Sequence, residues 1–310
     1  MNDKLIMKKI AAVVVTYNRK ELLAFCLEAI CAQTYKPYTV YIIDNASTDG
    51  TDDWIKENHY DGLKDSIDFH YVRLQENIGG SGGFYTGMKM AHEAPDEFDA
   101  IWMMDDDGIP DKKQLYHLVS HLDQYDYLSS FVVSKEDQSM CAMENCSVQE
   151  YEKTATDGLI LNAANPFNGV LYSRKLVDVI GYPVKDMFIW GDEYNYHLRC
   201  IKLGFTPAIV VAAKHVHPKD RQQRQKLFKR YYSIPEQDWK LYVYVRNITY
   251  NNRTLSRRAR HYYKVSLFVA LEYTYYLTLV KPSLHKLAIV YRAIYDGICK
   301  DLTRLHYYKK

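Results

Sequence analysis

Short runs of apolar residues alternate along the first half of the chain with segments in which apolar residues recur every three or four positions. The runs at 9–16, 38–43 and 67–74 are rich in β-branched and aromatic residues, as in strands covered on both faces. The segments at 21–33 and 51–58 have the periodicity of helices. The order strand, helix, strand, helix, strand predicts a parallel sheet with right-handed crossovers.

The alternation continues past these elements and then gives way to a different pattern. A further helix is predicted at 84–92, entered from a glycine-rich loop at 79–83. Beyond residue 214 the sequence is rich in Lys, Arg and Tyr at helical spacing. We therefore expect an α/β domain over 1–220, followed by a basic, Tyr-rich helical region over 221–310.

The composition is that of an ordinary globular protein, but the charge is unevenly distributed. The chain has 310 residues, of which 47% are hydrophobic, and this excludes disordered and collagen-like classes. The net charge of +2 combines 19 Lys+Arg and 32 Asp+Glu over 1–213 with 21 and 6 over 214–310. This asymmetry suggests an anionic partner for the basic part, such as a membrane surface or nucleic acid. A charge-balanced, solubilising surface is the simpler alternative.

Neither a signal peptide nor a membrane span is expected from the apolar runs. The basic N-terminus and the run at 10–15 superficially resemble a signal peptide, but the run has six residues and no cleavage site follows it. The longest apolar stretch, 265–280, is interrupted by Glu272 and is shorter than the roughly 18 residues that a span needs. The six cysteines show no CxxC spacing. We therefore expect a cytoplasmic protein with reduced thiols.

Three consecutive carboxylates follow a fourth predicted strand at 99–104. Like charges held as closely as those of Asp105, Asp106 and Asp107 are unfavourable unless something neutralises them. A divalent cation such as Mg²⁺ or Mn²⁺, bound through oxygen ligands and bridging to a diphosphate, would do so. Because alternate residues of an extended segment point the same way, Asp105 and Asp107 could share the ion while Asp106 turns elsewhere. A solvated acidic turn is the alternative.

Three other polar segments are candidates for chemistry. Gly79-Gly-Ser-Gly-Gly83 would let backbone N–H groups approach an anionic ligand, or would form a flexible turn. The acidic pair Asp192-Glu193 stands at the entrance of a helix, after a turn at Asn168-Gly169, and could supply a general base or a cap. His215 and His217 follow an apolar run, and one of them is a plausible third metal ligand beside the Asp triplet.

The order of these motifs resembles that of the inverting GT-A glycosyltransferases of family 2, over about residues 9–220. Within the family it is most similar to the bacterial galactofuranosyltransferase and rhamnosyltransferase branch. The resemblance is carried by five motifs in register: Val13-Val-Val-Thr-Tyr-Asn-Arg19, Ile43-Asp-Asn-Ala-Ser-Thr-Asp-Gly50, Asn77-Ile-Gly-Gly-Ser-Gly-Gly83, Trp102-Met-Met-Asp-Asp-Asp107 and Trp190-Gly-Asp-Glu193. It implies the GT-A fold, with a mostly parallel central sheet flanked by helices and a C-terminal helical region.

The resemblance also implies a donor site for a nucleotide sugar at the carboxyl ends of the strands. The residues assigned to this site are Thr16, Tyr17, Asn18, Arg19, Asp44, Asn45, Asn77, Gly80, Gly82, Gly83, Asp105 and Asp106. Asn18 is also expected to cap the first helix. A UDP-linked donor is favoured.

The metal, the base and the acceptor are assigned in the same way. Asp105 and Asp107 match the outer positions of the family's DxD motif, and His217 matches the downstream histidine ligand, with His215 as the alternative. A divalent Mn²⁺ or Mg²⁺ is implied. The family's base is the second member of an acidic pair, which is Glu193 here, although Asp-Glu stands where Glu-Asp or Asp-Asp is usual and Asp192 stays a candidate. The acceptor subsite is assigned to Trp190, Asn168 and Gly169.

The resemblance leads to one main function and two alternatives. We expect an inverting, metal-dependent enzyme that transfers galactofuranose from UDP-galactofuranose to a bacterial surface glycan, which in this branch is often lipid-linked. Transfer of rhamnose from dTDP-rhamnose is the nearest enzymatic alternative. A non-catalytic module that binds nucleotide sugars or nucleic acid is the alternative of another class, although no nucleic-acid-binding signature accompanies the basic region.

The basic region is expected to be amphipathic. Five cations alternate there with apolar residues: Lys281, Lys286, Arg292, Lys300 and Arg304. Such a pattern is typical of helices at a membrane interface, so peripheral contact with the inner face of the cell membrane is expected. Packing on the catalytic domain or on a second subunit of a homo-oligomer is the alternative.

Overall fold

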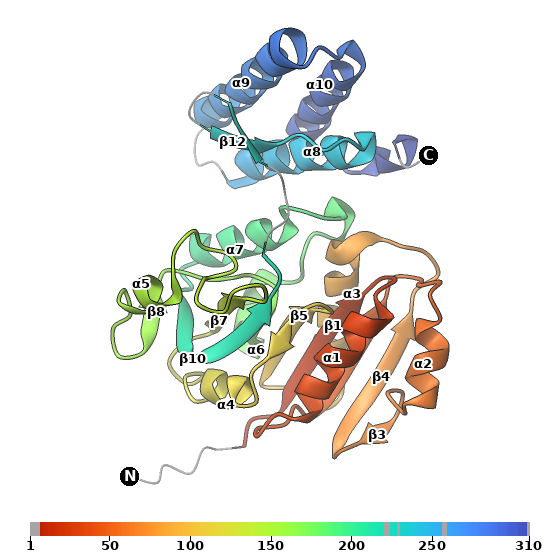
Figure 1. The fold of residues 1–310 in the computed structure, drawn as a ribbon, viewed down its shortest axis with the longest axis vertical. Helices are drawn as coiled ribbons and strands as arrows, with labels where there is room; N and C mark the ends of the chain where they lie inside the picture. The colour runs from red at the N-terminus through yellow and green to blue at the C-terminus, as the bar shows by residue number, and fades with distance from the viewer. Residues whose placement is uncertain (1–6, 220–223, 228–229, 256–258, 309–310) are drawn as a thin grey trace. The chain divides into compact units, whose positions relative to one another are not determined.

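The chain divides into two compact units in the computed structural model, which describes residues 7–219, 224–227, 230–255 and 259–308 (Figure 1). The first unit comprises Met1–Lys185 and Arg199–Asp220, and the second comprises Asp186–Leu198 and Arg221–Lys310. The division differs from the predicted one because the segment Asp186–Leu198 belongs with the C-terminal part. Residues 1–6, which begin the basic N-terminus, lie outside the described residues.

A ten-stranded mixed sheet forms the centre of the first unit, with nine strands in the order β3-β4-β2-β1-β5-β9-β7-β10-β6 and β8 paired to β10. The strands are β1 (Ile10–Thr16), β2 (Thr39–Asp44), β3 (Leu63–Lys64), β4 (Ile67–Arg73), β5 (Ala100–Asp105), β6 (Ile109–Pro110), β7 (Tyr127–Ser134), β8 (Leu159–Leu161), β9 (Asn168–Ser173) and β10 (Pro207–His217). The predicted parallel core is confirmed, since β4, β2, β1 and β5 pair in parallel. Strand β9 runs antiparallel to β5 and β7.

Helices cover the sheet because successive side chains of its strands point to opposite faces. The helices of the first unit, together with α7, which spans the boundary, are α1 (Lys20–Cys31), α2 (Thr51–Glu57), α3 (Gly79–Glu93), α4 (Gln114–Val119), α5 (Val148–Glu152), α6 (Arg174–Ile180) and α7 (Asp192–Lys202). A 3₁₀ turn, η1 (Lys185–Met187), precedes α7. Ile10, Ala12 and Val14 of β1 share a core with the buried face of α1. Val13 and Val15, on the other face of β1, lie under α3.

The glycine-rich segment is part of helix α3 and not a loop before it, which corrects the prediction. A Cβ on Gly83 would lie 2.5 Å from Cγ1 of Val15, and a Cβ on Gly87 would lie 2.3 Å from Cγ1 of Val13. These glycines recur at helical spacing on the face that meets β1. They let the helix backbone approach the sheet more closely than any larger residue would allow.

Two predicted local features are also wrong. Helix α1 begins at Lys20, after an N-cap at Arg19 that has no side-chain cap bond, so Asn18 is not the cap. The Asn18 residue instead has a φ of 51° and accepts a hydrogen bond from the Thr48 N–H. Asn168-Gly169 is not a turn, because both residues belong to β9, where Gly169 forms a bulge against β5.

The second unit consists mainly of helices around its own core. It contains the hairpin β11 (Arg224–Leu227) and β12 (Arg230–Ser233), then α8 (Asp238–Leu255), α9 (Ala259–Tyr275), the π-helical segment η2 (Tyr276–Val280), α10 (Leu284–Cys299) and the 3₁₀ segment η3 (Thr303–Tyr307). Helical structure therefore begins at Asp238 and not at 214, because β10 runs on to His217 and the hairpin follows. No helix among the described residues has the length and apolarity needed to cross a bilayer.

Several apolar residues of α10 are used for packing, whereas Leu284, Tyr291 and Tyr295 are exposed. Ile289 and Ile294 are buried with Val243 and Val245 of α8 and with Leu277 of η2 in one core. Part of the amphipathic pattern around the predicted cations is thus satisfied inside the second unit.

Candidate active site

Polar side chains converge where the parallel strands of the first unit end. Thr16, the last residue of β1, is in register with Asp44, the last residue of β2. Asp105 ends β5 one position earlier along β1, opposite Val15. The carboxyl ends of neighbouring parallel strands are where ligands bind in sheets of this type. The structure therefore places the predicted donor and metal residues at one edge.

Asp105, Asp107 and His217 form a cluster with one possible ligand atom each, and these atoms lie within 4.8 Å of one another. Asp106 points elsewhere, but not through strand alternation, because β5 ends at Asp105 and Asp106 lies in the turn that follows. Its Oδ2 accepts a hydrogen bond of 2.7 Å from Thr16 Oγ1, and its Oδ1 lies 3.1 Å from Nη1 of Arg19. Two carboxylate oxygens and an imidazole nitrogen are donors that suit Mn²⁺ and similar divalent ions. The residues fit a metal.

The carboxylates are held at an electrostatic cost. Burial, followed by repulsion from Asp107 and Asp106, raises the pKa of Asp105 to about 8. Burial also raises the pKa of Asp106 to about 6, although the Arg19 charge opposes the rise. For Asp107 burial is outweighed by the hydrogen bond and charge of His217 and by the charge of Arg19, so its pKa is lowered. A cation at this position would relieve the repulsion.

His217 is oriented by the backbone carbonyl of the next residue, Pro218. Its Nδ1 lies 2.7 Å from the carbonyl oxygen of Pro218 and its Nε2 lies 3.2 Å from Oδ1 of Asp107. The Pro218 carbonyl accepts a hydrogen bond, so in the neutral ring the proton is on Nδ1 and the lone pair of Nε2 faces the carboxylates. Burial alone would lower the pKa of His217, but the hydrogen bond and charge of Asp107 raise it by more, so the net shift of the pKa is upward.

His215, the alternative metal ligand, has a different environment. It is fully buried, its Nδ1 lies 3.1 Å from Oε1 of Gln114, and burial lowers its pKa to about 3. A Cβ on Gly108 would lie 2.2 Å from its Nε2, and a Cβ on Gly169 would lie 2.8 Å from its Nδ1. His215 thus packs beneath the Asp105–Gly108 turn as a neutral ring. The geometry favours His217 as the ligand.

The end of β2 is organised by a buried carboxylate. Asp44 is fully buried, accepts hydrogen bonds from Ser47, and receives the Tyr71 hydroxyl at 2.6 Å. Arg73 donates to the carbonyl of Ser47 at 2.9 Å. The Asp44 carboxylate therefore shapes the loop that follows β2 and does not face solvent.

Loop residues beside Asp44 differ in accessibility. Asn18 bridges to this loop, since its N–H donates to Ser47 Oγ and its Oδ1 accepts from the Thr48 N–H at 2.7 Å. Tyr17 is 43% exposed, which leaves its ring free to stack on a planar base. Asn45 is buried, and its Oδ1 finds no hydrogen-bond partner among the described residues. Its amide lies 3.1 Å from the position of a Cβ on Gly83.

The residues around the start of α3 have mixed surroundings. The Oδ1 of Asn77 accepts a hydrogen bond of 2.8 Å from the Gly79 N–H and so orders the start of the helix. A Cβ on Gly82 would lie 2.6 Å from Ile78, whereas a Cβ on Gly80 would meet nothing within 4 Å. Gly82 and Gly83 are therefore required for packing. Gly80 leaves backbone open at the first turn.

Trp190, Asp192 and Glu193 belong to the second unit. Asp192 is 4% exposed, whereas Glu193 is half-buried and its Oε2 accepts a hydrogen bond of 3.0 Å from the Gly191 N–H. Trp190 has a φ of 60° and its ring meets Tyr244 edge-on, with centroids 6.3 Å apart. Of the acidic pair, Glu193 is thus the more accessible to an acceptor hydroxyl.

Asn168 and Gly169, assigned to the acceptor, lie in the first unit. The Nδ2 of Asn168 donates to the Pro166 carbonyl at 3.0 Å. The Gly169 carbonyl accepts from Ser130 Oγ and, at 3.3 Å, from Gln114 Nε2. Gly169 has a φ of 69° and is enclosed by Gln114, His215 and Ser130. The Gly169 backbone therefore packs against the ring of His215.

Several organising residues were not predicted. Tyr71 and Arg73 lie inside a predicted strand, and the rule that ligands gather at strand ends could have drawn attention to them. Gln114 links His215 to β9 through contacts distant in sequence, so no local pattern indicates it. Arg246 and Asn247 on α8 form a polar pair within an apolar stretch of the sequence. Such a pair indicates buried polar side chains that need hydrogen-bond partners inside the fold.

Comparison with known proteins decides the family. A model described as glycosyl transferase family 2 matches residues 11–153. The galactofuranosyltransferase GlfT1 of Mycobacterium tuberculosis (strain H37Rv) is 30% identical over 221 residues, which cover 68% of this chain and 70% of that protein. The chain belongs to glycosyltransferase family 2. GlfT1 of Mycolicibacterium smegmatis is 29% identical over 222 residues, covering 67% and 70% of the two chains.

Solved structures agree on the fold of this glycosyltransferase. The crystal structure of Staphylococcus aureus TarS 1–349 in complex with UDP-GlcNAc superposes with a TM-score of 0.57 and 14% identity, covering 96% of this chain and 83% of that one. The predicted GT-A α/β fold, with a helical C-terminal region, is thereby confirmed. The predicted enzyme class, a glycosyltransferase, is confirmed as well.

Proposed function

We propose that this glycosyltransferase moves galactofuranose from UDP-galactofuranose to a bacterial surface-glycan acceptor, with inversion at the transferred carbon. The observation that carries the proposal is the cluster of Asp105, Asp107 and His217 at the edge where β1, β2 and β5 end. Such a cluster suits the diphosphate of a nucleotide sugar and its counter-ion. The sugar is inferred from the two relatives of about 30% identity, both named galactofuranosyltransferases.

A divalent ion would be held by Asp105, Asp107 and His217. When bound, it would offset the charge of the leaving nucleoside diphosphate. Arg19, paired with Asp106 and Asp107 at 3.1 Å, is half-exposed and can turn towards the phosphates once the carboxylates are neutralised. The requirement for Mn²⁺ or Mg²⁺ is part of the proposal.

The donor base and ribose would lie beside the loops after β1 and β2. Tyr17 offers an exposed ring, and the unpartnered Oδ1 of Asn45 can accept from a donor hydroxyl or amide. Asp44 would act indirectly, because its hydrogen bonds with Ser47 and Tyr71 hold the loop after β2 in one conformation. A solved structure of TarS contains UDP-GlcNAc, which supports a nucleotide-sugar donor for the shared fold.

Glu193 would take the proton of the acceptor hydroxyl. Inverting transfer needs one carboxylate in this role, because the hydroxyl has to become a better nucleophile as the sugar bond breaks. Glu193 is preferred to Asp192 because the latter is nearly fully buried. Trp190 would contact the acceptor sugar from the same loop.

The function is tested by supplying the purified protein with a bacterial surface-glycan acceptor and with UDP-galactofuranose, UDP-galactopyranose or dTDP-rhamnose, each with Mn²⁺ or with EDTA. We expect release of UDP from UDP-galactofuranose in the presence of Mn²⁺, and NMR of the product should show the inverted anomer. Donor at a hundred times its Kd should stabilise the fold by about 2.7 kcal/mol. Faster turnover of dTDP-rhamnose would instead establish the rhamnosyltransferase alternative.

We further propose that the second unit meets the inner membrane surface through α9. Six apolar side chains, between 43% and 73% exposed, recur on one side of α9 and η2; we call them the α9 strip: Leu267, Phe268, Leu271, Tyr275, Leu279 and Val280. Exposed lysines, Lys264 and Lys281, stand near its two ends. Glu272, the acidic residue of α9, is buried and accepts a hydrogen bond from Tyr232.

The α9 strip therefore combines apolar area with positive charge and presents no carboxylate of its own helix. That combination matches the surface of an anionic bilayer, where apolar side chains enter the acyl boundary and lysines meet headgroups. A lipid-linked acceptor would be reached at such a surface.

A further inference from the structure

We propose that Asn247 and Asn251 of α8 are positioning residues for the acidic pair, and that they act by fixing the backbone of residues 187–191 immediately before it. The inference rests on the proposed role of Glu193 as the base. The acidic pair begins α7, and the loop before it is short. Any movement of the loop therefore moves the Glu193 carboxylate.

Asn247 binds three successive parts of this loop with a single amide group. Its Nδ2 lies 3.0 Å from the carbonyl oxygen of Met187, 3.0 Å from that of Ile189 and 2.8 Å from that of Trp190. The side chain is 1% exposed. The Nδ2 group has two N–H hydrogens, so at least one of them is shared between two of the three carbonyl oxygens. Because buried carbonyl groups lose water on folding, these bonds favour this loop conformation.

Asn251 lies one helical turn further along the same face of α8 and binds both the loop and α7. Its Nδ2 donates to the Gly191 carbonyl at 2.8 Å, and its Oδ1 accepts from Nδ2 of Asn195 at 2.8 Å. Asn195 is fully buried on the first turn of α7. Asn251 thus fastens the end of the loop to the helix that carries Asp192 and Glu193.

The loop needs this support because its backbone is strained. Phe188 and Trp190 have φ values of 73° and 60°, in the left-handed region that residues with a side chain rarely adopt, and Gly191 has a φ of 91°. Such conformations persist when surrounding contacts determine them, and they concentrate at functional sites. A Cβ on Gly191 would lie 3.2 Å from Nδ2 of Asn251, so glycine is also required for the close approach.

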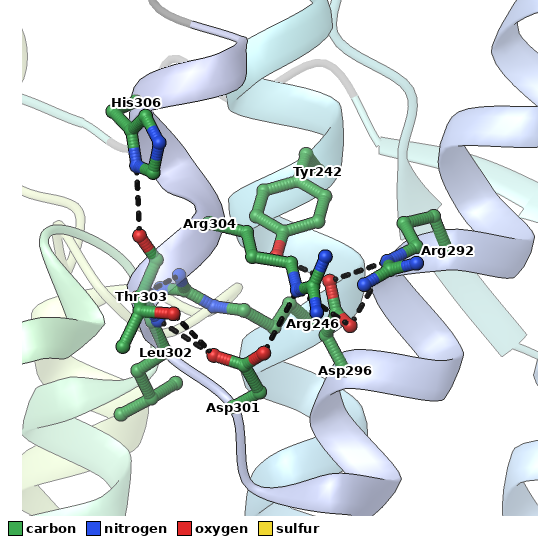
Figure 2. A network of polar contacts seen from close by, with 9 residues as sticks. All are labelled: Tyr242, Arg246, Arg292, Asp296, Asp301, Leu302, Thr303, Arg304 and His306. Atoms are coloured by element: carbon green, nitrogen blue, oxygen red, sulfur yellow. Dashed lines mark hydrogen bonds and ion pairs between the residues drawn. The ribbon is translucent and has the colours of Figure 1, made fainter.

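Arg246 orients the Asn247 amide. Its Nε donates to Oδ1 of Asn247 at 3.0 Å, which turns the Nδ2 group towards the loop. Its Nη2 donates to the carbonyls of Asp186 and Met187, at 3.2 and 3.0 Å. Figure 2 shows the same guanidinium reaching Leu302, beside Tyr242 and the buried Asp296, which is paired with Arg292. The loop is thereby tied to the core of the second unit.

The last contact of the loop is with the candidate base itself. The Gly191 N–H donates to Oε2 of Glu193 at 3.0 Å, while the Gly191 carbonyl accepts from Asn251. The two peptide units that flank Gly191 thus connect Asn251 of α8 to the Glu193 carboxylate. This chain of contacts is how two asparagines that need not touch substrate would set the direction of Glu193.

The test uses Asn247→Asp and Asn251→Asp, which keep the side-chain shape and the acceptor oxygen but remove the donors. Asn252→Asp is the matched control, since Asn252 is a half-buried asparagine of the same helix. For each full-length protein, kcat and KM for UDP-galactofuranose are measured. Hydrogen exchange of residues 187–193 is followed by mass spectrometry, and the melting temperature reports on folding.

We expect kcat to fall about 100-fold in Asn247→Asp and about 10-fold or more in Asn251→Asp, the scale associated with misplacing a catalytic group by about 1 Å. The KM for the donor should stay within about threefold, because the donor residues lie on other elements. Amide exchange at 187–193 should accelerate in both variants and stay unchanged in the control.

Unchanged kcat in both folded variants, or a loss shared equally by Asn252→Asp, would overturn the positioning role. If Asn247→Asp does not fold, Asn251→Asp still tests the positioning role, because it loses only the hydrogen bond donated to the Gly191 carbonyl. Glu193→Gln is measured in parallel: if it keeps full activity, the assignment of the base fails. Accelerated exchange of the loop in the asparagine variants would then still show that α8 holds it.

Discussion

The imidazole of His217 and the carboxylate of Asp107 are 3.2 Å apart, and the other ring nitrogen of His217 is held by the Pro218 carbonyl at 2.7 Å. The ring therefore cannot turn away from the carboxylates without losing a hydrogen bond. The ring is thereby kept in the cluster whose possible ligand atoms, one each from Asp105, Asp107 and His217, lie within 4.8 Å of one another.

Replacing His217 with Gln should weaken Mn²⁺ binding about 10-fold or more, because the amide is a poorer donor than imidazole and loses the orientation given by Pro218. Isothermal titration of the purified protein with Mn²⁺ measures the change. His70→Gln is a suitable control, since His70 also lies 2.8 Å from an aspartate, Asp68, but on the surface. Equal affinities in wild type and His217→Gln would contradict the metal assignment.

Glu193→Gln should reduce transfer by about 10² to 10⁴, the usual contribution of a general base, while donor binding is retained. Asp192→Asn should have a smaller effect on kcat, because Asp192 is buried and less able to meet the acceptor. Steady-state kinetics and a donor-binding titration separate the two quantities. Equal losses in both variants would require a different division of roles.

Gly83→Ala should destabilise the fold by about 1 to 3 kcal/mol, because the new methyl group would meet Val15 in a packed core. Gly80→Ala, in the same helix, should instead be neutral or stabilise by up to about 1 kcal/mol, since its methyl group would meet nothing. Urea unfolding of the two variants gives both values. Equal stabilities would show that α3 does not need the close approach.

His197 should make stability depend on pH. Burial lowers the pKa of His197 below its ordinary value. His197 therefore binds a proton more readily in the unfolded chain than in the folded one. The contribution of the neutral, buried His197 to the free energy of unfolding is complete above the ordinary histidine pKa and is lost as the pH falls below that value. We expect His197→Gln to lose less stability than wild type between pH 7.5 and 5, as measured by urea unfolding at each pH. Parallel curves for the two proteins would contradict this.

Leu271→Glu with Leu279→Glu should abolish flotation of the protein with vesicles of phosphatidylcholine and phosphatidylglycerol, because charges would enter the α9 strip. Binding by wild type should also weaken as salt is raised. Leu203→Glu is the control, since Leu203 is 59% exposed outside the strip. Wild type that stays with the soluble fraction at every lipid composition would refute the membrane proposal.

The sheet and the acidic cluster followed from local patterns. The strands that end in Thr16, Asp44 and Asp105 are continuous apolar runs, and the polar residue that closes each run marks the ligand edge. Predictions of this kind need no knowledge of distant contacts.

What could not be predicted depends on contacts between distant segments. Nothing near Asn168 indicates a bulge, because the reason for it is the space that Gly169 leaves for His215 and Gln114. The glycines of α3 read as a loop because their packing partners, Val13 and Val15, lie about 70 residues away in the sequence. Several apolar residues of the pattern in α10, such as Ile289 and Ile294, are buried in one core with residues of α8, and that contact is distant in sequence.

The dependence of residues 186–198 on α8 also limits how the gene can be divided. A gene cut after codon 220 would still encode the acidic cluster and both members of the acidic pair. It would lack Arg246, Asn247 and Asn251, and the loop before Glu193 would be synthesised without the helix that holds it. A chimera of related proteins that exchanges residues 186–198 would therefore have to exchange α8 together with them.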